Sequence, residues 1–158
     1  MDKKLAKLFD EAICLEINVA QLYDIFRWYF PDDDFFWARL SMEERNHAAL
    51  LEAGKNNFKP QDQFPDDILP SSIKDLSSVN LELSDLIDQY NKKPPSREEA
   101  FNIALDMEKA AGEFHFQKFM GKTTATTLDQ IFQKLNMDDK DHAKRIHNYM
   151  AENGIAVK

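Results

Sequence analysis

Four long segments of this chain repeat apolar residues at the three- and four-residue spacing of an α-helix. They cover about residues 2–30, 34–53, 96–120 and 127–152. Only four glycines occur, whereas Ala, Leu, Glu, Lys and Gln, which favour helices, are common. The 158 residues are enough for one domain with a core of its own. The sequence therefore predicts a single all-α domain over residues 1–158.

Start and stop signals separate the four predicted helices. The acidic run at 32–34 offers N-caps for the second helix, which we expect to end at Gly54. Ser96 and Glu99 have the spacing of a capping box at the start of the third helix. Gly154 closes the fourth.

The connection between the second and third helices, about residues 55–95, has a different composition. Residues 55–78 carry Asn, Asp, Ser and three of the six prolines, which indicates a surface connection, and we expect a small helix from about Val79 to Tyr90. A short turn makes neighbouring helices antiparallel, whereas a connection of this length can return the chain to the far end of a bundle. The predicted architecture is a ferritin-like four-helix bundle with one long crossover connection between helices two and three.

Charged residues interrupt the apolar stripe of every predicted helix. Helices one and three each place one glutamate there, and helices two and four each place an acid followed three residues later by a histidine. These residues are Glu16, Glu44, His47, Glu108, Asp139 and His142. Residues three apart lie on one helix face, so each acid and its histidine can bind the same ion.

Four acids in one core need a positive charge close by. Burying a single carboxylate without one costs roughly several kcal/mol, and four would also repel each other. No lysine or arginine lies nearby on the same stripes, so two divalent metal ions are the best source of that charge. Carboxylate and imidazole ligands suit iron, which we prefer, or manganese, and zinc is also compatible. One acid from each of two helices, with acid-x-x-His from each of the others, is the ligand pattern of di-iron carboxylate bundles.

The two halves of the chain look duplicated, since each has a single acid on its first helix and an acid-x-x-His on its second. Seven residues after the single acid, on the same face, are Tyr23 in one half and His115 in the other. Tyr23 either hydrogen-bonds a ligand carboxylate or packs in the core. His115 either supports the ligands from behind or is a core histidine with its own partners.

The four helical segments resemble the rubrerythrin branch of the ferritin-like superfamily. AICLEINVAQLY and LSMEERNHAALL look like its first two helices, and IALDMEKAAGEFHF and LNMDDKDHAKRI look like its third and fourth. The resemblance covers the four long helices and leaves out residues 55–95. It implies metal-ligand positions at Glu16, Glu44, His47, Glu108 and His142, with Asp139 as the sixth.

Three departures from the family pattern affect the expected chemistry. Asp139 replaces the usual glutamate and reaches about 1.5 Å less far. Rubrerythrins carry a second glutamate on helix three, where this chain has Ala111. These 158 residues contain no cysteine-rich rubredoxin-like segment, so we expect any electrons that are needed to come from another protein or a soluble donor.

The resemblance implies a redox protein that oxidises ferrous iron or reduces peroxide or dioxygen at a di-iron site. Two alternatives stay open: a non-catalytic metal-binding or iron-handling module, and a helical interaction domain with an empty site. Glu44 and His47 taken alone could also be solvated surface residues. An error of one residue in phase would expose Asp139.

Partners and location follow from composition. The formal charge of −8 argues against nucleic acid as a partner. No signal peptide or membrane-spanning stretch is found, so we expect a cytoplasmic protein. The single cysteine, Cys14, excludes an internal disulfide, and we interpret it as a small buried hydrophobic residue.

Aromatic residues crowd the turn between helices one and two: Phe26, Trp28, Tyr29, Phe30, Phe35, Phe36 and Trp37. One stripe cannot bury all of them. They could form a bulky end-cap of the bundle or anchor the contact of a homodimer, which is the expected oligomer.

Overall fold

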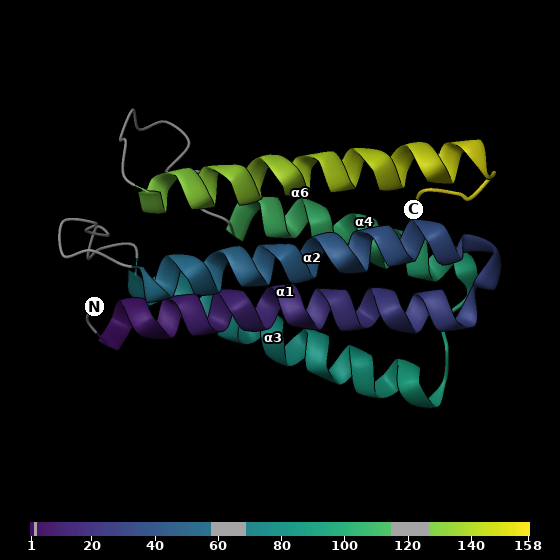
Figure 1. The fold of residues 1–158 in the computed structure, drawn as a ribbon. Coiled ribbons are helices and arrows are strands. Elements are labelled where there is room, and N and C mark those ends of the chain that lie inside the picture. Colours follow the sequence, from purple (N-terminus) through teal and green to yellow (C-terminus); the bar gives the residue numbers. More distant parts are fainter. Residues whose placement is uncertain (2, 58–68, 115–126) are drawn as a thin grey trace. The chain divides into compact units, whose positions relative to one another are not determined.

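The computed structural model describes residues 1, 3–57, 69–114 and 127–158 (Figure 1). This part of the chain forms the helices α1 (Lys3–Tyr29), α2 (Asp34–Asn56), α3 (Leu69–Lys92), α4 (Arg97–Phe114) and α6 (Thr127–Glu152), with a 3₁₀ turn, η1 (Pro31–Asp33), between α1 and α2. No β-strand occurs among these residues. The prediction of an all-α fold is therefore confirmed.

Two compact units make up the fold. Unit 1 contains α1, α2 and α3, and unit 2 contains α4 and α6 from Asp129 onward. The crossover architecture and the single-domain boundary stay predictions. None of the described helices is both long and apolar enough to cross a membrane.

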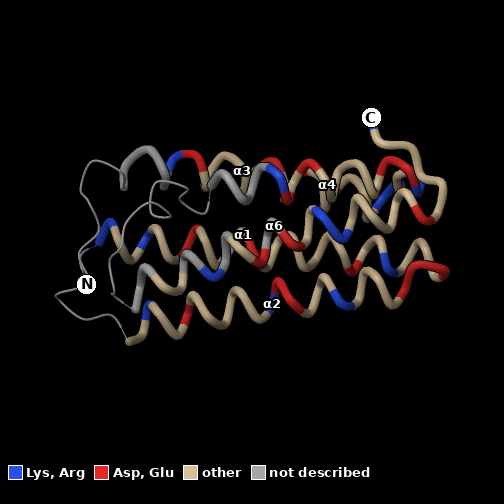
Figure 2. Tube along the Cα trace, turned by 90° about the horizontal axis from the view of Figure 1, so that it is seen from above, with Lys and Arg blue, Asp and Glu red and all other residues tan. Residues whose placement is uncertain are grey.

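Within unit 1, α1 lies between α2 and α3 (Figures 1 and 2). Apolar side chains are buried along its whole length at three- and four-residue spacing, as in an amphipathic helix that packs on two neighbours. The buried apolar residues are Leu5, Leu8, Phe9, Ala12, Leu15, Val19, Ala20, Leu22, Tyr23 and Phe26 on α1, Trp37, Leu40, Ala48 and Leu51 on α2, and Leu76, Leu83 and Tyr90 on α3.

A buried asparagine, Asn80, joins α3 to α1. Its Nδ2 donates to the Glu11 carbonyl oxygen at 2.9 Å and to Glu11 Oε2 at 3.1 Å. Its Oδ1 accepts from Asn18 Nδ2 at 3.1 Å. Buried polar groups cost free energy unless they are paired, so these bonds favour one register of α3 on α1.

Several helix boundaries differ from the sequence prediction. Helix α2 continues through Gly54 to Asn56, and Asn57 ends it by donating from both its backbone N (3.0 Å) and its Nδ2 (2.8 Å) to the Ala53 carbonyl. Glycine inside a helix costs only about 1 kcal/mol, so it does not have to stop one. Asp33 occupies the N-cap position of α2, but its side chain makes no capping hydrogen bond.

The small helix expected at 79–90 is in fact the longer helix α3, which begins at Leu69. Residues 69–78, predicted to be surface connection, are therefore helical. Pro70 does not prevent this because it falls in the first turn, where a helix needs no backbone N–H donor.

The capping predictions for the other two helices are confirmed. The Ser96 Oγ accepts from the Glu99 backbone N at 3.2 Å, and Glu99 Oε2 accepts from the Ser96 backbone N at 3.4 Å, which is a complete capping box. Gly154 has a φ of 65°, and the Ile155 N–H returns to the Met150 carbonyl at 2.9 Å. This is the left-handed C-terminal cap that favours glycine.

In unit 2, the chain after α6 folds back on the first turns of α4. Asn102 Nδ2 donates to the carbonyls of Glu98 and Ala156, both at 2.8 Å, and its Oδ1 accepts from the Lys158 backbone N at 2.8 Å. The Phe101 and Tyr149 rings stack at 5.4 Å. The third helix was expected to reach Met120, and the part of this range beyond Phe114 lies outside the described residues.

Candidate metal centre

Three of the predicted ligands meet inside unit 1. Helix α1 places Glu16, and α2 places Glu44 and His47, with 2%, 2% and 5% of their surfaces exposed. His47 Nδ1 lies 3.0 Å from Glu44 Oε2 and 3.4 Å from Glu16 Oε2. One ligand atom from each residue lies within 4.8 Å of the others, so the three could hold a metal ion.

The neighbouring residues on the two helices leave room for these side chains. Ala12 and Ala20, one turn before and one turn after Glu16, are fully buried. Ala48 stands one turn after Glu44 and is also buried. Residues four apart lie above one another on a helix face. Small side chains at these places therefore give the carboxylates and the imidazole space between α1 and α2.

The charge on His47 is set by two opposing effects. Burial lowers the pKa of His47, but the hydrogen bonds and charges of Glu16 and Glu44 outweigh it and raise the pKa to about 10. At neutral pH the His47 ring of the metal-free centre is therefore protonated, an imidazolium beside the Glu16 and Glu44 side chains. A cation is part of this cluster, and a divalent ion that replaces the His47 proton would neutralise the two carboxylates.

Unit 2 brings together two further predicted ligands. Glu108 on α4 and His142 on α6 are 3% and 2% exposed, and His142 Nδ1 lies 3.5 Å from Glu108 Oε2. Asp139 lies on α6, one turn before His142, but its side chain is outside the described part of the structure.

A polar network that the sequence prediction missed lies one turn from the unit 1 ligands. Ser41 is buried, and its hydroxyl donates to the Ala20 carbonyl oxygen (3.1 Å) or to Asp24 Oδ1 (2.7 Å). Arg45 forms an ion pair with Asp24. The available signal was Ser41 itself, a polar residue three positions before Glu44 on the same apolar stripe.

The remaining candidates have different outcomes. Tyr23 is fully buried and packs against Trp37 and Phe26 at ring distances of 5.5 and 6.5 Å, while its hydrogen bond to a ligand stays a prediction. His115 lies outside the described residues. Cys14 is exposed, so its interpretation as a buried residue was wrong. Partial burial and the Glu11 carboxylate raise the pKa of its thiol, which does not favour the reactive thiolate.

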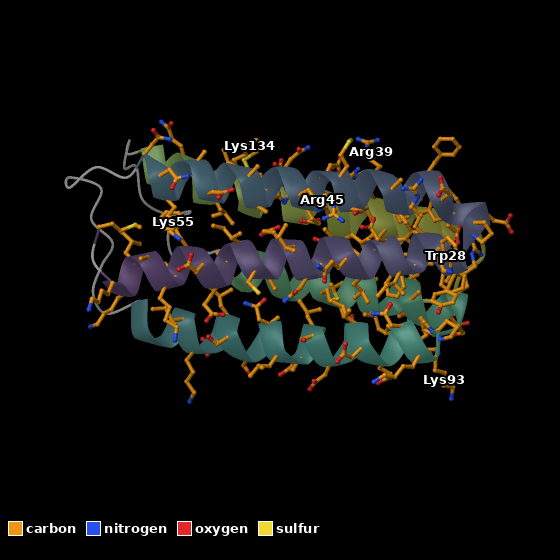
Figure 3. All side chains as sticks on the ribbon, turned by 60° about the horizontal axis from the view of Figure 1, so that its bottom comes forward. Trp28, Arg39, Arg45, Lys55, Lys93 and Lys134 are labelled. Atoms are coloured by element: carbon orange, nitrogen blue, oxygen red, sulfur yellow. The ribbon has the colours of Figure 1, made fainter. Side chains whose placement is uncertain are left out.

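The seven aromatic residues at the α1–α2 turn differ in burial, and three of them, Tyr29, Phe30 and Phe36, are partly buried. Phe26 and Trp37 are fully buried in contact with each other at 5.1 Å, and Tyr90 of α3 lies 6.0 Å from Phe26. Trp28 and Phe35 instead expose 82% and 92% of their surfaces. Figure 3 shows Trp28 at the end of unit 1 opposite Lys55.

Comparison with known proteins adds no family assignment to this geometry. No protein-family model, curated protein or solved structure matches the chain. The resemblance to rubrerythrins therefore stays a prediction from the sequence, and the function has to be inferred from the side chains described above.

Proposed function

We propose that this protein is a di-metal carboxylate protein of rubrerythrin type that binds iron. The observation that carries the proposal is the buried cluster of Glu16, Glu44 and His47 on α1 and α2. The predicted ligands on α4 and α6 complete the proposed ligand set of six: Glu108, Asp139 and His142.

The unit 1 residues fit a metal ion by their chemistry. Two carboxylates and one imidazole form a mixed oxygen and nitrogen donor set that suits iron or manganese, and zinc is compatible. A purely structural role explains the cluster less well. Taking charged groups out of water costs several kcal/mol per ion, roughly, and a buried ion pair often returns no more than that. A metal ion bound by all three groups gives a direct reason for burying them.

Two bound iron ions would supply redox chemistry, either the oxidation of ferrous iron or the reduction of peroxide or dioxygen with electrons from an external donor. The chain's own part is to hold the ions away from bulk water. In addition, His47 must release its proton when its nitrogen binds metal.

Metal analysis of the purified, anaerobically reconstituted protein tests the proposal. We expect two ions per chain in the wild type and a loss of bound metal in Glu44→Ala and His47→Ala. Glu43→Ala is the matched control, because this neighbouring acid is only part-buried and pairs with exposed Arg39. The proposal fails if the wild type binds no metal after reconstitution with ferrous iron.

A non-catalytic iron-handling module is the second candidate. It is favoured by Ala111, which stands where rubrerythrins carry their second helix-three glutamate, and by the short Asp139. Stopped-flow mixing of the ferrous-loaded protein with peroxide separates the two. Rapid oxidation of the iron supports the redox enzyme, and a rate no faster than that of free ferrous iron supports the passive module.

A further inference from the structure

We propose that the two metal ions bind in a fixed order, and that Glu16, Glu44 and His47 form a self-sufficient site for the first ion. This inference rests on the proposed function, because it concerns the same ligands. It adds a specific division of labour: unit 1 binds an ion without help from the ligands of unit 2.

The geometry of unit 1 meets the requirements of such a site. All three ligands come from two helices of the same compact unit, and each is at least nine-tenths buried. Their ligand atoms lie within 4.8 Å of one another before any ion is bound. Three protein ligands are enough to hold a divalent ion when water fills the other positions.

The two helices that carry these ligands are tied together on both sides of the site. Towards the N-terminus of α1, Lys55 of α2 forms an ion pair with Asp10. On the other side, Ser41 and Arg45 of α2 bind Asp24 of α1. Figure 3 shows Lys55 and Arg45 at separate places along α2. A site whose supporting helices are already fixed loses less free energy to ordering when it binds its ligand.

Unit 2 offers a weaker set of donors. Its described ligands are one carboxylate, Glu108, and one imidazole, His142, whose nearest ligand atoms are 3.5 Å apart. The third predicted ligand, Asp139, has a side chain about 1.5 Å shorter than the glutamate usual at this position. Metal affinity rises with the number and charge of the ligands. The ion that depends on unit 2 is therefore the second to bind and the first to be lost.

The order can be tested by anaerobic titration of the metal-free full-length protein with Co²⁺, followed by visible absorption and by calorimetry. We expect two steps in the wild type, with the first at least 10-fold tighter. The double variant Glu108→Gln/His142→Gln should keep the first step within about 3-fold of its wild-type affinity and lose the second. The double variant Glu16→Gln/His47→Gln should lose the tight step.

Glutamine preserves side-chain size, and circular dichroism of each metal-free variant checks that it is folded. For a variant that does not fold, the single changes Glu108→Gln and Glu16→Gln replace it. Two equal steps in the wild type would overturn the binding order. Loss of both steps in the Glu108→Gln/His142→Gln variant would overturn it as well. Both results leave the proposed di-metal function standing. Absence of any Co²⁺ binding by the wild type overturns the proposed function together with the order.

Discussion

In the metal-free centre the positive charge lies on the protonated ring of His47. Its Nδ1 faces a carboxylate oxygen of Glu44 at 3.0 Å and one of Glu16 at 3.4 Å, and these contacts raise the pKa of the ring to about 10. The folded protein therefore binds this proton more tightly than the unfolded chain does. The same proton competes with any metal ion that uses the ring nitrogen. Proton and metal are thus alternative occupants of the same cluster.

This competition predicts a pH dependence of stability in the metal-free protein. A pKa raised from 6.5 to about 10 stabilises the fold fully below about pH 6.5, and the contribution is lost as the pH rises towards about 10. We expect wild type to exceed His47→Gln in free energy of unfolding most clearly near pH 6, with the difference shrinking by about pH 10. Urea unfolding in the presence of a chelator measures the free energy of unfolding of both proteins at each pH. If the difference in free energy of unfolding between wild type and His47→Gln grew with pH, the raised pKa of His47 would be contradicted.

Gly154 is the described residue whose backbone most clearly requires glycine. Its φ of 65° is unfavourable for other L-residues, although a Cβ at this position would meet no atom within 4 Å. Gly154→Ala should therefore lower the free energy of unfolding by about 1 kcal/mol through backbone conformation alone. Gly54→Ala, inside α2, is the control and should raise it by up to about 1 kcal/mol. If both changes altered the free energy of unfolding equally, the left-handed backbone of Gly154 would not be the cause.

The pairing of α1 with α2 depends on polar contacts as well as apolar packing. Ser41 is the centre of these contacts, because its hydroxyl reaches both the Ala20 carbonyl and Asp24 on α1. Ala20 lies one turn after Glu16, and Ser41 lies one turn before Glu44. The hydrogen bonds of Ser41 across the two helices therefore help to set the spacing between the Glu16 and Glu44 carboxylates.

Replacing Ser41 should weaken metal binding without removing a ligand. We expect Ser41→Ala to reduce the affinity for the first Co²⁺ about 10-fold, as is typical when a group that orients metal ligands is lost. Ser78→Ala on α3 is the control, since Ser78 is exposed and its hydroxyl donates to Glu82 Oε1 of the same helix at 3.5 Å. Unchanged affinity in Ser41→Ala, measured by the same titration, would show that apolar packing alone sets the spacing.

The helices and the burial of Glu16, Glu44 and His47 could be predicted because their signals are local. Apolar periodicity gives the helices, and Glu16, Glu44 and His47 stand out as polar residues on apolar stripes. The contacts of Ser41 with Asp24 could not be predicted in this way. They depend on how α1 and α2 are rotated and shifted against each other, which is a property of two packed helices.

Errors in the predicted boundaries have a similar origin. Gly54 was interpreted as a stop signal, but a single glycine costs too little to end a helix whose neighbours pack well. The start of α3 was missed because Pro70 was counted against a helix instead of being placed in its first turn. Composition identifies residues that weaken a helix, whereas tertiary packing decides whether the helix tolerates them.

The surface of unit 1 suggests how whole molecules associate. At the α1–α2 turn, Trp28 and Phe35 are 82% and 92% exposed to solvent. Arg27 and Asp34, the residues directly before them, form an ion pair at 2.5 Å that joins the two helices at this point. Large aromatic residues such as these are typical anchors of protein interfaces. A second copy of the chain presents the same residues, as a symmetric dimer requires.

We therefore expect the wild type to elute from size-exclusion chromatography at about twice the mass of one chain at micromolar concentration. Trp28→Ser/Phe35→Ser should shift the protein to the mass of one chain and leave its metal content unchanged, because neither side chain is a ligand. Leu81→Ser is the matched control: this residue is 68% exposed and lies on α3 instead of the α1–α2 turn, so the dimer should persist. A wild type that elutes as a single chain would instead make the exposed pair a surface for some other partner.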